Sequence, residues 1–153
     1  MDIGLIYSYM GAALAVGLAG IGSSIGIGYA GMASSGLLAE EPEKFGKALI
    51  LVALPGTQGI YGFLVCFLIW IKLGGTAGAM DPTKGLALLL ASLPVGIGGL
   101  FSGMYQGKVS ASGINVLAKK PDDFFTAAVM SVLVETYALL GLVASILIWL
   151  KVG

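Results

Sequence analysis

The chain has 153 residues, of which 58% are hydrophobic and only 10% charged, and its mean hydropathy is +0.99. This composition leaves too little polar surface to cover a soluble globule of the same size. Eight basic residues balance eight acidic ones, so the formal net charge is zero and gives no argument for a nucleic-acid partner.

Four long runs with few or no charges follow one another along the chain. A bilayer core about 30 Å thick needs about 20 apolar residues to cross it as a helix, and a spanning segment must satisfy its own backbone hydrogen bonds. We therefore predict an all-α integral membrane protein whose four transmembrane helices cover about residues 4–39, 44–73, 84–118 and 122–151.

The four helices form two copies of one unit. Shifting the sequence by 79 residues aligns residues 12–72 with 91–151 without a gap, and 19 of the 61 pairs are identical, including two prolines, two tryptophans and two lysines. Each copy reads as an αα-hairpin with a charged, proline-containing turn. The predicted repeats are residues 1–79 and 80–153. Each repeat contains two spans, so the second copy has the same orientation in the membrane as the first.

The first helix of each hairpin carries small residues four positions apart, a spacing that lets helix backbones approach closely in lipid. These rows favour either a compact bundle within one chain or a tightly packed inner layer among many copies. The two rows are Gly22, Gly26, Ala30 and Ser34, and Gly99, Gly103, Gly107 and Ala111.

No nucleotide site is predicted in this chain. Residues 26–31 match G-x-G-x-x-G, but the motif lies in the middle of a spanning helix rather than between a strand and a helix. A phosphate-binding G-x-x-x-x-G-K-[ST] loop is also missing from the sequence. If nucleotide energy drives this protein, another chain handles the nucleotide.

Glu135 is the one acidic residue in the interior of a predicted span. A charge at a helix centre costs about 2.5–3.5 kcal/mol on insertion scales, so such a residue is a functional hypothesis by default. Its counterpart in the first repeat is Gly56. Counting from the charged turns at 1.5 Å per residue puts Glu135, Gln106, Thr57 and Gln58 at one depth, about 20 Å from the turns.

Oxygen-bearing side chains at that depth have two interpretations. Thr57, Gln58 and Gln106 could form interhelical hydrogen bonds and nothing more. Alternatively they could join Glu135 in binding a hard alkali cation, which needs several oxygens, whereas a proton needs only the carboxyl group. Tyr61 could hold the carboxylate in place. Pro55 removes a backbone donor and should free a carbonyl near Thr57, by this argument that of Leu51.

The sequence resembles the rotor-ring proteolipids (c or K subunits) of V-type ATPases, particularly the sodium-translocating branch. The resemblance covers essentially the whole chain. It rests most specifically on residues 54–62 (LPGTQGIYG), 106–109 (QGKV), 118–121 (AKKP) and 134–137 (VETY).

This resemblance implies a closed homo-oligomeric ring with the first helix of each hairpin inside and the second outside. It implies a non-catalytic subunit of an ATP-driven rotary pump that carries one Na⁺ at each Glu135. The implied sodium ligands are the Leu54 carbonyl, the Thr57 hydroxyl, the Gln58 and Gln106 amide oxygens and the Glu135 carboxylate, with Tyr61 as a hydrogen-bond donor and Pro55 and Gly56 as site support.

The partners implied by the resemblance are other copies of the chain, lipid, a stator membrane subunit that supplies an arginine, and central-stalk subunits. The stalk would meet the proline turns at Glu41, Pro42, Glu43, Lys119, Lys120 and Pro121. Five lysines lie near these turns and three near the opposite ends, which weakly favours cytoplasmic turns. The expected location is the bacterial cell membrane, as a multi-pass protein.

Two alternatives remain beside the sodium rotor. The same ring could carry H⁺, and a small multidrug/proton antiporter could use a single membrane glutamate. A purely structural membrane bundle is a third interpretation.

Overall fold

The computed structural model describes residues 2–75 and 79–152. It is helical nearly throughout, and four helices are long and apolar enough to cross a membrane, at Ile3–Glu40, Pro42–Gly74, Pro82–Lys119 and Pro121–Lys151. The predicted division between residues 79 and 80 adjoins positions 76–78, which, like both chain ends at 1 and 153, lie outside the described residues.

The predicted second helix is divided in the structure. Of the spanning helices, α1 (Ile3–Glu40) and α4 (Pro82–Lys119) are uninterrupted, and α5 (Phe124–Lys151) follows a short 3₁₀ turn. The remaining span consists of α2 (Phe45–Ala53), a 3₁₀ segment at Leu54–Gly56, and α3 (Thr57–Gly74). Pro55 has no amide hydrogen, so the α-helical hydrogen bonding tightens there into a 3₁₀ turn.

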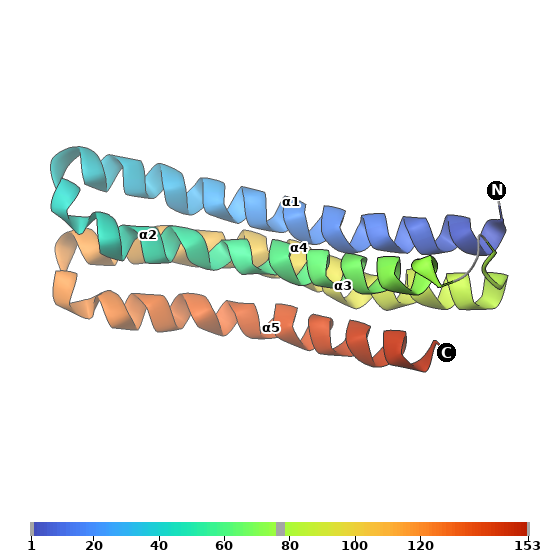
Figure 1. The fold of residues 1–153 in the computed structure, drawn as a ribbon. Coiled ribbons are helices and arrows are strands. Elements are labelled where there is room, and N and C mark those ends of the chain that lie inside the picture. Colours follow the sequence, from blue (N-terminus) through green and yellow to red (C-terminus); the bar gives the residue numbers. More distant parts are fainter. Residues whose placement is uncertain (1, 76–78, 153) are drawn as a thin grey trace.

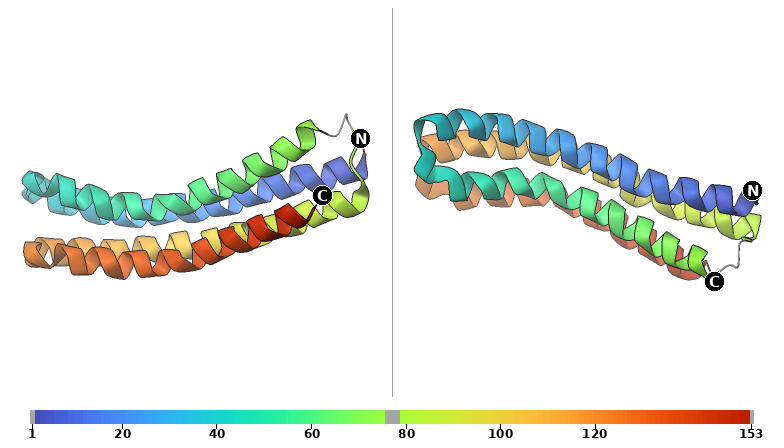
Figure 2. Two further views of the ribbon diagram at one scale, coloured as in Figure 1. Left: turned by 60° about the horizontal axis from the view of Figure 1, so that its bottom comes forward. Right: turned by 45° about the horizontal axis from the view of Figure 1, so that its top comes forward.

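The helices form two layers along one direction (Figure 1). In one layer α1 lies beside α4, and in the other the α2–α3 span and α5 cover them (Figure 2). Both proline turns lie at one end of the bundle, and the two chain ends lie at the other (Figure 1). Towards the end that carries the chain termini the two layers diverge (Figure 2).

Glycines bring the backbones of α1 and α4 into direct contact. A Cβ atom at Gly26 would overlap the carbonyl oxygen of Gly103, and one at Gly107 would overlap the backbone of Gly26. Close backbone approach substitutes for the hydrophobic driving force that is missing in lipid. The two small-residue rows therefore pack against each other within a single chain.

Aspartates cap both α1 and α4. Asp2 accepts a hydrogen bond from the Gly4 amide at 2.8 Å, and Asp81 accepts from the amides of Thr83 at 2.8 Å and Lys84 at 3.2 Å. Caps of this kind satisfy amides that have no partner inside the helix. The bonds from the Lys84 and Thr83 amides lower the pKa of the Asp81 carboxyl group.

The two proline turns are joined by lysines of the first hairpin. Lys44 donates to the Ala118 carbonyl at 3.1 Å and forms an ion pair with Glu41 at 2.6 Å. Lys47 donates to the Pro121 carbonyl at 2.9 Å. These contacts join the two hairpins at the end of the bundle where each hairpin reverses direction.

Candidate ion-binding site

Glu135 is 8% exposed, and its carboxylate lies between the two hairpins. The Tyr61 hydroxyl of α3 donates a hydrogen bond to its Oε1 atom at 2.5 Å. The Gln106 amide nitrogen of α4 donates to its Oε2 atom at 3.3 Å. Helices from both repeats therefore hold the two oxygens of the single acid that lies within a spanning run.

Two fully buried glutamines continue this network. The amide nitrogen of Gln58 donates to the amide oxygen of Gln106, and it also approaches the Ser102 hydroxyl at 3.1 Å. A buried amide without partners would cost free energy, and these two amides serve each other. The network thus runs without interruption from Glu135 through Gln106 to Gln58.

The 3₁₀ segment supplies the far side of the site. The Thr57 hydroxyl donates to the Leu54 carbonyl at 3.0 Å and lies 3.4 Å from the Gln58 amide oxygen. The Leu54 carbonyl also accepts the backbone N–H of Thr57, which is the short bond of the 3₁₀ turn. The missing amide hydrogen of Pro55 predicts a free carbonyl at Leu51. In the structure, the carbonyl that contacts the Thr57 hydroxyl is that of Leu54.

The first repeat contains an apolar counterpart of the Glu135 site. Gly56, the repeat equivalent of Glu135, faces Ile27, because a Cβ atom there would lie 3.2 Å from the Ile27 side chain. Ile27 is the equivalent of Gln106. Pro55 is buried beside Gly26, where an added Cβ would lie 2.8 Å away. Pro55 and Gly56 have no polar side-chain atoms, so their side chains add no oxygen to the network.

Two serines that the predicted ligand set omits also take part. Ser102 donates to the carbonyl of Val134 at 3.0 Å, and Ser23 accepts from the Gly59 amide at 2.8 Å. Ser23 and Ser102 occupy the same position in the two repeats. Ser23 joins α1 to α3, and Ser102 joins α4 to α5. Their identity across the repeat is the sequence signal that could have found them.

The chemistry of the donor set suits a hard monovalent or divalent cation, or a proton, better than a transition metal. No group of three His, Cys, Asp or Glu side chains gathers anywhere in residues 2–75 and 79–152. The oxygens belong instead to one carboxylate, two amides, a hydroxyl and a backbone carbonyl. Oxygen ligands of this kind select hard ions.

The residues of the proposed stalk-contact turns lie at the opposite end from the chain termini. Pro42, Glu43, Lys119, Lys120 and Pro121 are exposed, and Glu41 is half-buried by its ion pair with Lys44. This surface is polar and lies at one end of the spanning helices.

Fold and site together define a multi-pass membrane protein with two tandem helical hairpins and one buried acid. The family of the ATP synthase C subunit matches the chain twice, at residues 10–69 and 89–148. The chain belongs to this family, and each match covers one hairpin.

Curated relatives extend over almost the whole chain. The V-type sodium ATPase subunit K of Enterococcus hirae is 49% identical over 97% of this chain and 93% of its own length. The A-type ATP synthase subunit K of Methanocaldococcus jannaschii is 42% identical over 94% of this chain, which spans 62% of that relative. A 16 kDa proteolipid of the V-type proton ATPase of Caenorhabditis elegans is 30% identical over 93% of this chain and 88% of its own length.

Proposed function

We propose that the chain is a rotor-ring subunit of a V-type ATPase and carries one Na⁺ across the membrane at Glu135. The observation that carries the proposal is the convergence of oxygen-bearing groups from both hairpins around this lone intramembrane acid. The V-type sodium ATPase subunit K, at 49% identity, supports the choice of ion.

The proposed sodium ligands are drawn from the network already described. A half-turn of a glutamine amide exchanges its nitrogen for its oxygen, so Gln58 and Gln106 can both turn an oxygen towards a cation. The remaining ligands would be the Leu54 carbonyl, the Thr57 hydroxyl and the Glu135 carboxylate. Several oxygens in place of the hydration shell are what an alkali cation requires for binding at this depth.

Tyr61 has a separate role in this proposal. Its hydroxyl donates to the carboxylate at 2.5 Å and has no place among the cation ligands, since it holds Glu135 in the orientation that binds the ion. With one cation bound, the carboxylate and its ion are together neutral. A neutral site can pass through lipid, where a lone charge would be costly.

The ring is part of the same proposal. Large apolar side chains are exposed along the spans, among them Met32 at 69%, Phe125 at 74% and Tyr137 at 71%. So many exposed large apolar side chains in one chain support contact with lipid and with other copies. In a closed ring, α1 and α4 would line the inside, and the α2–α3 span and α5 the outside.

Transport would follow from rotation of that ring against a stator. A stator arginine would compete with Na⁺ for the Glu135 carboxylate, and central-stalk subunits would turn the ring through Glu41, Pro42, Glu43, Lys119, Lys120 and Pro121. Moving one charge against 100 mV costs about 2.3 kcal/mol, so an ATP-hydrolysing partner must supply the energy. This chain would be a non-catalytic subunit.

A proton is the second candidate cargo. The relative from Caenorhabditis elegans belongs to a proton ATPase, and protonation of Glu135 alone would suffice to neutralise the site. Membership of the family of the ATP synthase C subunit favours either rotor over the small antiporter.

Binding of ²²Na⁺ to the purified oligomer tests the proposal. We expect saturable binding near neutral pH, its loss in Glu135→Gln, and its retention in Glu40→Gln, which removes an exposed acid at the end of α1. Carbodiimide labelling of Glu135 should slow when Na⁺ is present. Carbodiimide reacts with the protonated carboxyl group. Labelling that is unaffected by Na⁺ and only becomes faster as the pH falls would therefore assign the cargo as H⁺.

A further inference from the structure

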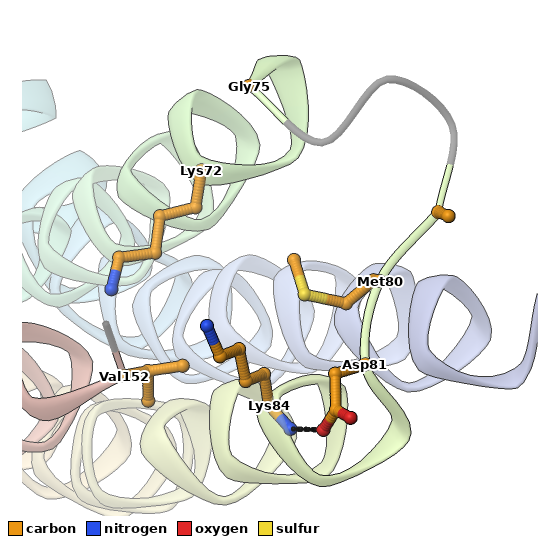
Figure 3. A pocket seen from close by; sticks show the side chains of 7 residues that line it. Lys72, Gly75, Met80, Asp81, Lys84 and Val152 are labelled. Carbon is orange, nitrogen blue, oxygen red and sulfur yellow. Dashed lines mark hydrogen bonds between the residues drawn. The ribbon is translucent and has the colours of Figure 1, made fainter.

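A cavity of about 430 Å³ lies at the end of the bundle opposite the proline turns, where the two layers diverge. Its wall is formed by the end of α3, the start of α4 and the segment after α5. The lining includes Lys72, Gly75, Met80, Asp81, Lys84 and Val152 (Figure 3). The cavity is separate from the Glu135 network, which shares none of these residues.

Two lysines from different helices reach into this cavity. Figure 3 shows the side chains of Lys72 and Lys84 extending into the same space, beside Val152. The Lys72 ammonium donates to the Trp149 carbonyl at 2.8 Å and lies 4.7 Å from the centre of the Trp149 ring. For Lys84, the described part of the chain provides its ammonium with neither a hydrogen bond nor an ion pair.

The one acid in the lining, Asp81, offsets only part of the charge of this pair. One carboxylate oxygen of Asp81 accepts both the Thr83 and Lys84 amides and so caps α4. Figure 3 shows the bond from Lys84. The cavity therefore has two ammonium groups against one carboxylate that already serves the helix end. Like charges facing the same space repel each other, and an anion between them would turn that repulsion into two attractions.

The residues around the cavity indicate its depth in the membrane. Trp149 packs beneath Lys72, and Trp70 is 60% exposed two residues earlier on α3. Tryptophans and lysines near helix ends are typical of the boundary between hydrocarbon and headgroups. We therefore expect the cavity to lie at the level of the lipid phosphates.

An apolar surface continues from the cavity. An adjoining cavity of about 310 Å³ shares Lys84 and Val152 and adds Ala87, Ile148 and Lys151. A free anion would need only the ammonium groups, whereas a phospholipid also needs apolar surface beside them for its acyl chains. Lysine ammonium groups beside such surface bind lipid phosphate groups.

We propose that Lys72 and Lys84 bind the phosphate of an anionic phospholipid headgroup in this cavity. The bound lipid would fill the space between the diverging layers and neutralise the lysine pair. Zwitterionic lipid carries a compensating ammonium group of its own and should bind more weakly.

Native mass spectrometry of the intact oligomer in detergent, with added phosphatidylglycerol or phosphatidylcholine, tests the proposal. We expect phosphatidylglycerol to be retained and phosphatidylcholine to be lost under the same activation. The Lys84→Gln variant should retain phosphatidylglycerol at least fivefold less, and the Lys72→Gln/Lys84→Gln variant should lose it. The control Lys119→Gln/Lys120→Gln removes the same charge from the opposite end and should bind as the original chain does.

The conservative variant Lys84→Arg keeps the charge and should restore retention, which separates loss of a ligand from loss of folding. Lys84 makes no side-chain bond within the described residues, so its substitution leaves the packing intact even if changes at Lys72 disturb the Trp149 contact. Equal retention by Lys84→Gln and the original oligomer would overturn the proposal. Displacement of the lipid by millimolar inorganic phosphate would instead assign the cavity to a free anion.

Discussion

Replacing Tyr61 with phenylalanine removes one hydroxyl group and tests whether that group holds the Glu135 carboxylate for ion binding. The hydroxyl donates to Oε1 at 2.5 Å, and the other oxygen keeps only the longer 3.3 Å bond from Gln106. A hydrogen bond to a charged group contributes about 1.5–3 kcal/mol. At 1.4 kcal/mol for each factor of ten, we expect Na⁺ affinity to fall by about ten- to a hundredfold.

The measurement is a ²²Na⁺ binding isotherm on the purified oligomer. The matched control is Tyr137→Phe, because Tyr137 lies two residues after Glu135 on the same helix and its side chain is 71% exposed. Affinity in the control should stay within twofold of the original. If Tyr61→Phe also stayed within twofold, the hydroxyl would not be positioning the carboxylate and the reasoning from this contact would be wrong.

Three further changes test the packing and the helix caps. Gly26→Ala should destabilise the oligomer by about 1–3 kcal/mol or more, because the added Cβ would overlap the Gly103 backbone. The control Gly28→Ala, on the same helix, adds a Cβ with no atom within 4 Å and should be neutral. Thermal unfolding in detergent compares the two variants. By the same measurement Ser145→Ala should cost about 1–3 kcal/mol, since the Val95 amide beside a helix proline then loses its 3.0 Å acceptor. The pKa of the Asp81 carboxyl group is lowered from 3.8 on folding, so its carboxylate stabilises the folded state above that pH and this contribution disappears as the pH falls through the lowered pKa. Asp81→Asn keeps a capping oxygen and should show less acid destabilisation in a pH series of unfolding measurements.

The spans could be predicted because lipid removes most alternatives. Runs of apolar residues give their length directly, and the predicted and observed ends of the four spans differ by two residues or fewer. The conformation of the interruption at Leu54–Gly56 was harder to predict. Proline shows where an amide hydrogen is missing, but it does not show whether the chain kinks, continues, or tightens to a 3₁₀ turn, and the packing of Gly26 against Pro55 bears on that choice.

Part of the Glu135 site could be predicted from the depth of its residues in the membrane. Equal counts on the two sides of the second proline turn put Gln106 and Glu135 at one level, and the two side chains are hydrogen-bonded in the structure. Depth alone does not give rotation about the helix axis, so it cannot say which side chains at that level meet. The contribution of Ser102 was missed for this reason, although it lies one turn from Gln106 on the same face.

Comparison of the two repeats explains why four helices hold a single buried acid. The pair Glu135 and Gln106 is hydrogen-bonded, while the equivalent pair Gly56 and Ile27 is an apolar contact. A carboxylate placed at Gly56 would face the Ile27 side chain and lack a donor, which costs free energy in a low-dielectric interior. Yet the first hairpin still contributes Tyr61 to the acid of the second. The second repeat therefore supplies the carboxylate, and the first repeat supplies a hydroxyl group that binds it.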